Sequence, residues 1–215
     1  MLTTARLRLR EWREEDLEPF AALNADPRVR EFFPSVLTYQ ESADSMAYVR
    51  HHFERHGFGL WALEVIGGAP FIGFIGLSVP PFDAPFMPCV ELGYRLAFEE
   101  WGRGYANEGS RAVLDYGFTT LGLKEIVAFT TASHQRSRAV MERLGMTRNP
   151  EDDFDHPNIA AGHRLRRHVL YRLIASEWTA RCGRLQMDLV QKSARASDSE
   201  RPCRGVRGAQ PLGRG

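Results

Sequence analysis

Apolar and polar residues alternate near the start of the chain, which is the pattern of a half-buried β-strand. In the segment TARLRLREW, Leu7 and Leu9 are separated by arginines, so an extended chain would carry one apolar and one charged face. Two further apolar runs, 58–67 and 70–79, meet at a glycine-rich turn that favours a hairpin. Another strand is expected through 89–96. The first half of the chain therefore predicts several antiparallel strands.

Apolar residues at near-helical spacing predict helices between and after these strands. They are expected at 14–25, 41–55, 105–121 and 134–144. Pro27 interrupts the first pattern and Gly57 closes the second. A strand at 124–131 separates the last two helices, and a final strand pair ends in 167–175. Antiparallel hairpins followed by a crossover predict a single α/β (α+β) domain with one mixed sheet.

The composition argues against several classes of partner. The 215 residues carry 28 Lys and Arg against 27 Asp and Glu, so no overall field favours nucleic acid or an anionic membrane. No apolar run approaches the roughly 20 residues that span a bilayer, and the N-terminus lacks the apolar core of a signal peptide. The three cysteines, Cys89, Cys182 and Cys203, have no metal-ligand spacing and suggest free thiols. We therefore expect a cytoplasmic protein.

The end of the chain differs in composition from the rest. From 183 to 215 it is rich in Arg, Gly and Ser and carries seven Lys or Arg against three Asp or Glu, a balance of 7 − 3 = +4. Such a segment buries too little apolar surface to fold, which places the domain at 1–182 and a disordered basic tail after it. A basic arm that binds RNA is the alternative to a merely solvated tail. We assign the tail no role.

A glycine-containing segment, EEWGRGYANEG at 99–109, joins an expected strand to an expected helix. Gly102 and Gly104 let the backbone approach a ligand, and the N–H groups at the start of the helix point back at the same loop. This arrangement suits a phosphate or pyrophosphate, although glycine at an ordinary strand-to-helix turn is the simpler explanation. The loop lacks the GK[ST] of a Walker A motif, and Asn107 stands where GxGxxG requires its third glycine.

The series VELGYRLAFEEWGRGYANEG, followed by TTASHQRSRAVMERLGM, resembles the acyl-CoA binding core of the GNAT N-acetyltransferases. Within that superfamily it is most similar to the ribosomal-protein N-terminal acetyltransferase branch, over about residues 1 to 177. The resemblance implies a strongly twisted mixed sheet flanked by helices, with two splayed central strands and the pantetheine arm of the cofactor in the gap between them. It implies acetyl-CoA as co-substrate, and no metal is expected.

The resemblance also implies which residues bind the cofactor. Backbone N–H groups of the glycine loop would hold the phosphates, the end of the preceding strand would pair with the pantetheine amides, and a histidine would replace the family's usual asparagine. These positions are Leu96, Ala97, Phe98, Trp101, Gly102, Arg103, Gly104, Tyr105, Ala106 and His134. Glu99 departs from the Gln or Arg that usually opens the loop, and Arg103 could offset its charge at the phosphates.

Acetyl transfer to an amine needs a base for the amine proton, and the departing thiolate benefits from an acid. Glu91 is the candidate base, because a carboxylate within an apolar strand should have a raised pKa. An ion pair with Arg95, two positions further along the same face, is the alternative. Ser137, in a helix whose expected N-cap is Ser133, could donate to the sulfur, or could be an ordinary surface serine.

The sequence indicates the acceptor site less clearly than the cofactor site. Phe32 and Phe33 come from a region that in the family covers the acceptor, and His168 comes from a basic segment near the other end of the domain. The spacing of His156, His163 and His168 matches no familiar zinc pattern, so packing or substrate contact is the better interpretation. The basic segment AGHRLRRH would suit an acidic acceptor, but a solvated loop explains it equally well.

These observations predict an N-acetyltransferase that moves an acetyl group from acetyl-CoA to a primary amine by direct attack in a ternary complex. A non-catalytic acyl-CoA-binding or regulatory module is the alternative, since it would keep the loop and lose the chemistry. The acceptor, either a protein N-terminus or a small-molecule amine, is not encoded in any motif. The oligomeric state is open, and a homodimer is compatible with the sequence. No nucleic acid or membrane partner is expected.

Overall fold

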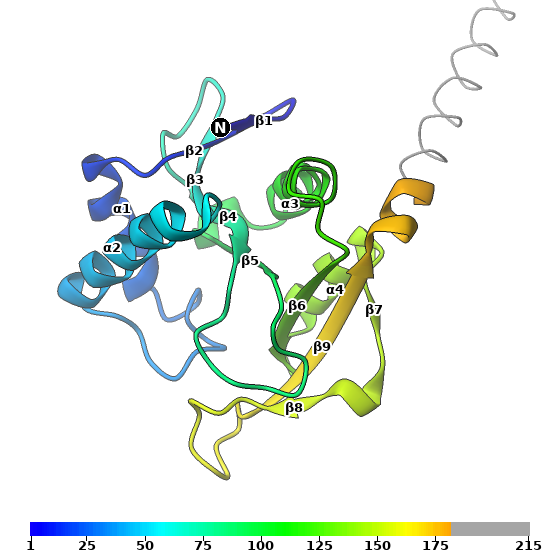
Figure 1. Ribbon diagram of the computed structural model, residues 1–215. Coiled ribbons are helices and arrows are strands. Elements are labelled where there is room, and N and C mark those ends of the chain that lie inside the picture. The colour runs from blue at the N-terminus through cyan, green and yellow to red at the C-terminus, as the bar shows by residue number, and fades with distance from the viewer. Residues whose placement is uncertain (182–215) are drawn as a thin grey trace, which may run out of the picture. The chain divides into compact units, whose positions relative to one another are not determined.

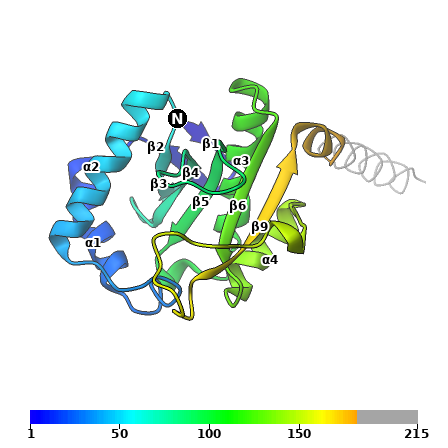
Figure 2. The same ribbon diagram turned by 60° about the horizontal axis from the view of Figure 1, so that its bottom comes forward.

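The computed structural model describes residues 1–181, and the expected tail at 183–215 and the thiols of Cys182 and Cys203 lie outside the described residues. A compact unit spans Met1–Ala175, and residues 176–181 belong to a second unit. The first unit is shown in Figures 1 and 2. No helix among residues 1–181 is long and apolar enough to cross a bilayer.

The first unit is one mixed sheet with helices on both faces. Its strands are β1 Leu2–Thr3, β2 Leu7–Arg10, β3 Leu60–Val65, β4 Gly73–Ser78, β5 Glu91–Leu96, β6 Glu125–Thr131, β7 Thr147–Arg148, β8 Phe154–Asp155 and β9 Arg167–Ile174. Its α-helices are α1 Leu17–Ala25, α2 Tyr39–His56, α3 Tyr105–Asp115 and α4 Gln135–Leu144. Single helical turns are found at Glu14–Asp16, Phe98–Glu100, Tyr116–Thr120 and Pro150–Asp152.

The strands lie in the order β1-β2-β3-β4-β5-β6-β9-β7, with β8 also paired to β9. All neighbours are antiparallel except β5 and β6, which are parallel. The alternating pattern at the start of the chain is confirmed as β2, where Leu7 and Leu9 are fully buried. The single α/β domain expected from the sequence is therefore the fold of this unit.

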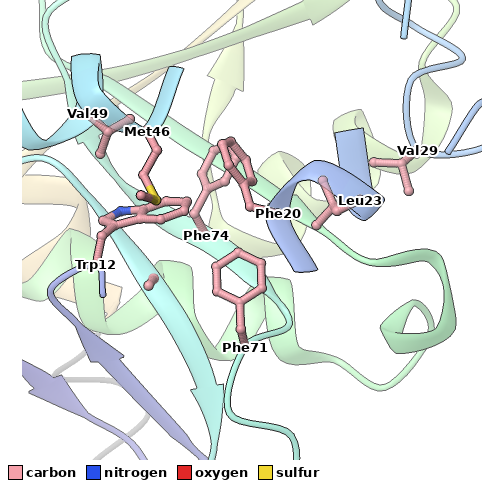
Figure 3. Close-up of a cluster of buried hydrophobic side chains, with 9 residues drawn as sticks. Trp12, Phe20, Leu23, Val29, Met46, Val49, Phe71 and Phe74 are labelled. Atoms are coloured by element: carbon pink, nitrogen blue, oxygen red, sulfur yellow. The ribbon is translucent and has the colours of Figure 1, made fainter. Parts of the chain in front are cut away.

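Helices α1 and α2 lie on one side of the sheet, and α3 and α4 on the other (Figures 1 and 2). The first pair covers an aromatic core (Figure 3), in which the Trp12 and Phe20 rings are 4.9 Å apart. The Trp12 indole donates to the Leu60 carbonyl oxygen. On the opposite face, a Cβ at Gly109 would lie 2.7 Å from the Ile75 Cδ1, so glycine allows α3 to approach the sheet closely.

Helix boundaries differ from the sequence expectation at several ends. The segment expected to open a helix at Glu14 is a 3-10 turn, because the Asp16 carboxylate accepts the Arg13 N–H and binds the buried Arg10. Helix α2 begins earlier than expected, after a capping box of Thr38 and Glu41. The helix expected at 105–121 changes into a π turn at Tyr116–Thr120. The N-cap expected at Ser133 is wrong, because His134 occupies that position.

The two central strands part after a single paired position, which confirms the splayed strands expected from the resemblance. Strands β4 and β5 pair over their whole length, whereas β5 and β6 pair only at Glu91 and Val127. A hydrogen bond of 2.9 Å from the Val127 N–H to the Val90 carbonyl oxygen closes this junction. From there toward Leu96 no strand of residues 1–181 pairs with the β6 side of β5.

Candidate active site

The glycine loop leads directly from β5 into α3. Gly102 has a φ of 77° and Gly104, the N-cap of α3, a φ of 83°, both in the left-handed region that favours glycine. The N–H groups of Gly102, Arg103 and Gly104, and of Tyr105 and Ala106 in the first turn of α3, make no hydrogen bond within the described residues. A Cβ at Gly102 would meet no atom within 4 Å. The residues present therefore fit a bound phosphate group.

Charges around this loop are arranged differently from the sequence expectation. Glu99 pairs with Arg28 at 2.9 Å, and the Arg28 guanidinium also lies over the Phe98 ring at 4.0 Å. Arg103 pairs with Glu100 at 3.5 Å. The acidic residue that departs from the family pattern is thus matched by a cation from the segment after α1, and sequence inspection did not find this partner because it lies 71 positions away.

Two more arginines lie beside the loop without having been predicted. Arg6 donates to the Arg103 carbonyl oxygen at 3.1 Å and lies over the Tyr105 ring at 4.7 Å, while its guanidinium is held by Glu108 at 2.6 Å. Arg136, in the first turn of α4, lies 5.0 Å from the Trp101 ring centroid. Both come from outside the segment 96–106, so no local motif could have identified them.

The end of β5 presents one residue, Leu96, to the gap between β5 and β6. The Trp101 indole donates to the Leu96 carbonyl oxygen at 2.9 Å, and the Ala97 N–H donates to Ile72 on the other side. Because successive residues of a strand direct their backbone groups to opposite sides, the Leu96 N–H faces the gap. The Phe98 carbonyl accepts the Trp101 N–H in a tight turn. Leu96 therefore has the orientation expected of a pantetheine partner, and Ala97 is turned away from the gap.

Glu91 lies at the junction where β5 and β6 separate. Its Cα is paired with Ser78 on β4 and with Val127 on β6, and its side chain is partly buried. Burial raises the pKa of its carboxyl to about 8, against a smaller opposing effect of a hydrogen bond with Ser78. The alternative of an ion pair with Arg95 is wrong, because the Arg95 guanidinium donates instead to the Asn24 Oδ1 at 2.8 Å.

Tyr94 and Ser137 join β5 to α4 on the opposite face of the sheet from Glu91. The Tyr94 hydroxyl donates to the Ser137 carbonyl oxygen at 3.0 Å and lies 2.9 Å from its Oγ. Ser137 is 8% exposed, so it is not an ordinary surface serine. Burial is the main cause that raises the pKa of Tyr94, which keeps the phenol protonated. The sequence pattern assigned no role to Tyr94.

His134 and Phe32 bring a predicted cofactor residue and a predicted acceptor residue together. Their rings are stacked, with centroids 4.0 Å apart and an interplanar angle of 16°. The His134 Nδ1 lies 3.0 Å from the Thr130 hydroxyl. Burial, with a smaller contribution from Arg136, lowers the pKa of His134 to about 4, so the imidazole is neutral at physiological pH.

Phe33 and His168 lie in different clusters. Phe33 packs its ring against the Arg95 guanidinium at 4.2 Å. His168 is buried, and its ring belongs to an aromatic cluster on the side of β6 and β9 that also carries Val127, the strand partner of Glu91. The rings of this cluster are Phe82, Phe86, Phe129, Phe154, His156 and His168. Within residues 1–181, no group of three or more His, Cys, Asp or Glu could hold a metal ion.

Comparison with known proteins agrees with this geometry. The Acetyltransferase (GNAT) domain family matches residues 6–147. The FsC-acetyl coenzyme A-N(2)-transacetylase of Aspergillus fumigatus is 31% identical over 188 residues, which cover 82% of this chain and 77% of that protein. A GNAT acetyltransferase structure from Bacillus anthracis superposes with a TM-score of 0.67 at 23% identity, covering 81% and 98% of the two chains.

A third similar protein was solved with the cofactor. The spermidine N-acetyltransferase of Vibrio cholerae, in complex with CoA and spermine, has a TM-score of 0.64 and 18% identity, covering 82% of this chain and 99% of its own. At that identity the likeness concerns the fold, which holds CoA in that protein. The matched domain, the parted strands and the glycine loop lead to one assignment: the chain belongs to the GNAT acetyltransferase family and is an acetyl-CoA-dependent acetyltransferase.

Proposed function

We propose that the protein transfers the acetyl group of acetyl-CoA to a primary amine by direct attack in a ternary complex, with Glu91 as the base. The observation that carries this proposal is the position of Glu91 at the point where β5 and β6 separate. A carboxyl with a pKa of about 8 is half ionised near that pH and can take a proton from the acceptor's ammonium group, which leaves a neutral amine to attack.

The opposite face of the sheet supplies a proton donor in this proposal. Bound acetyl-CoA would supply the thioester, and the amine would form the new C–N bond as the C–S bond breaks. The hydroxyl groups of Tyr94 and Ser137 are within hydrogen-bond distance of one another, and the phenol is protonated. We assign to this pair the donation of a proton to the departing sulfur. The amine proton goes to the Glu91 carboxylate, so the two faces have separate roles.

The glycine loop and the end of β5 are proposed to hold the cofactor. The N–H groups of the 102–106 segment would bind the phosphates, with Arg6 and Arg136 as nearby cations. The backbone of Leu96 would pair with a pantetheine amide, and His134 would border the pantetheine beside Phe32. Phe33 and His168 remain proposed acceptor-side residues.

The acceptor amine is either a protein N-terminus or a small molecule. We place the chain nearest the ribosomal-protein N-terminal acetyltransferase branch on the motifs quoted above, a finer assignment than family membership. The Aspergillus fumigatus relative is named for transfer from acetyl-CoA at an N(2) position, and the Vibrio cholerae enzyme for spermidine. These names support a nitrogen acceptor. The cytoplasmic location and the homodimer stay predictions.

Two variants test the proposal together. Gly104→Val should abolish acetyl-CoA binding in isothermal titration, because a branched residue is strained at a φ of 83°. Glu91→Gln should retain acetyl-CoA binding and lose at least about tenfold in turnover at neutral pH, measured as free CoA thiol with a panel of primary amines. Unchanged turnover in Glu91→Gln would eliminate Glu91 as the base. Failure of the wild-type chain to bind acetyl-CoA would overturn the proposed function itself.

A further inference from the structure

Arg95 is a partly buried arginine of the first unit that lacks an anionic partner among the described residues. Within the described residues no carboxylate forms an ion pair with it, and its buried Nε makes no hydrogen bond. Its one hydrogen bond there joins Nη1 to the Asn24 Oδ1, and the Asn24 amide is oriented by donating to the Ser42 hydroxyl at 3.2 Å. Donors removed from water are normally paired, so the buried and unpaired Nε of this guanidinium needs an explanation.

Aromatic rings and a second cation surround this guanidinium. Its central carbon lies 4.2 Å from the Phe33 ring centroid and 5.2 Å from that of Phe74. The Arg30 guanidinium lies 4.3 Å from the same Phe33 ring. Among neighbouring carboxylates, Glu41 acts on Arg30, but its side chain is exposed and engaged with Thr38 at the start of α2. Two arginines therefore meet at Phe33 with little negative charge to balance them.

Burial disfavours the charged form of the Arg95 guanidinium. It lowers the pKa of Arg95 to about 9, and the repulsion of Arg30 adds to the effect. The aromatic faces compensate the lost hydration only in part, because a cation over a ring is stabilised by about 0.5 to 2 kcal/mol. A bound anion would neutralise the pair and use the free donors of Arg95, since arginine binds carboxylate and phosphate through two parallel hydrogen bonds.

The position of Arg95 relative to Glu91 indicates where such an anion would lie. Both residues are on β5, four positions apart and on the same face, so their Cα atoms are about 13 Å apart at the usual rise of a strand. No ion pair joins them. An acceptor whose amine reaches Glu91 could therefore place an anionic group at Arg95 only if several bonds separate the two groups.

We propose that the acceptor amine carries a remote anionic group, and that Arg95, with Arg30 beside it across the Phe33 ring, binds this group while the amine lies at Glu91. The inference rests on the proposed function and narrows its substrate class. A carboxylate at the far end of a small amine and an acidic side chain near a protein N-terminus share this chemistry. A polyamine has no such group and would be repelled by both arginines.

The test compares acceptors that differ only in the anion. Wild-type enzyme and acetyl-CoA are assayed by CoA thiol release with linear amino acids from 4-aminobutanoate to 8-aminooctanoate, with their amides, and with spermidine. Tripeptide amides with glutamate or glutamine at the third position form the second arm, which separates a peptide from a small molecule. We expect kcat/KM to favour the anion by at least about tenfold at the best length, as for a charge-assisted hydrogen bond.

Variants of the two arginines test whether they cause the preference for anionic acceptors. Arg95→Gln should bring the ratio of kcat/KM for the anionic acceptor to kcat/KM for the neutral acceptor close to one. Its acetyl-CoA affinity, measured by titration, should stay unchanged. The control is Arg55→Gln, at an exposed position near the end of α2, which should keep the full ratio. Arg30→Gln should lower the ratio in part, and it serves as the deciding variant if circular dichroism shows that Arg95→Gln is unfolded.

Several results would overturn the inference. These are equal kcat/KM for anionic and neutral acceptors in the wild type, a preference that survives in Arg95→Gln, and a preference for spermidine over every anionic acceptor. Turnover of none of these amines by a protein that binds acetyl-CoA would also count against it. The proposed function survives the first three results, and it fails separately if acetyl-CoA does not bind or if no primary amine is acetylated.

Discussion

Glu91 should make the folded protein less stable as the pH rises, and Glu91→Gln should remove this effect. The carboxyl titrates near 4.5 in the unfolded chain and near 8 in the folded protein. Between these values folding takes up a proton, so the free energy of unfolding falls with increasing pH and levels off above the folded pKa. At 1.36 kcal/mol per pKa unit, the whole shift corresponds to at most about 5 kcal/mol.

We expect a measured difference of about 2 to 4 kcal/mol, because the carboxyl is only partly buried and solvent reduces the penalty. Urea unfolding of wild type and Glu91→Gln at about pH 5 and about pH 9 gives the free energy of unfolding of each. The variant should be close to wild type at the lower pH and more stable at the higher one. Other titrating groups cancel in this difference.

The exposed carboxylate of Glu18, on α1, provides the matched control, since Glu18→Gln should show no such pH-dependent gain. A Glu91→Gln protein that is less stable than wild type at both pH values, or a difference that does not change with pH, would refute the reasoning. A gain in stability together with a loss of turnover would show that the enzyme retains this carboxylate for chemistry at the expense of stability.

Three further changes test other parts of the structure. Asp16→Asn leaves the buried Arg10 with Glu64 as its remaining carboxylate partner among the described residues and should lower the free energy of unfolding by about 3 kcal/mol in urea; a loss below about 1 kcal/mol would contradict this. Thr38→Ala removes the capping box of α2 and should cost about 1 kcal/mol in thermal unfolding, and an unchanged melting temperature would exclude that role. Tyr94→Phe should lower kcat at least about tenfold with acetyl-CoA affinity unchanged, and wild-type kcat would remove it from the proton donors.

The sequence predicted those features that depend on local patterns. Alternation identified β2, and the position of Glu91 in an apolar strand predicted a raised pKa. Features that depend on distant segments were missed. Arg28 neutralises Glu99, and Asn24 binds Arg95, each from a position 71 residues away. No period or motif along the chain could show either contact.

Local competition explains the errors at helix ends. The Asp16 side chain binds both the Arg13 N–H and Arg10, so a tight turn replaces the first residues of the expected helix. His134 is the N-cap residue of α4, and its ring contacts Thr130 and Phe32 instead of capping the helix. In both cases side-chain contacts determined the boundary that helix propensity had placed elsewhere.

The single junction between β5 and β6 also affects how the chain folds. The sheet from β1 to β5 joins strands in sequence order, so it can form before β6 is available. During that time β5 is an edge strand with free backbone groups, the kind of surface on which chains aggregate. In the finished fold part of this edge persists, because β6 diverges from it. The Trp101 indole donates a hydrogen bond to the Leu96 carbonyl oxygen, so that oxygen is not available to another chain's strand. The edge that this contact protects is the one that the cofactor is proposed to use.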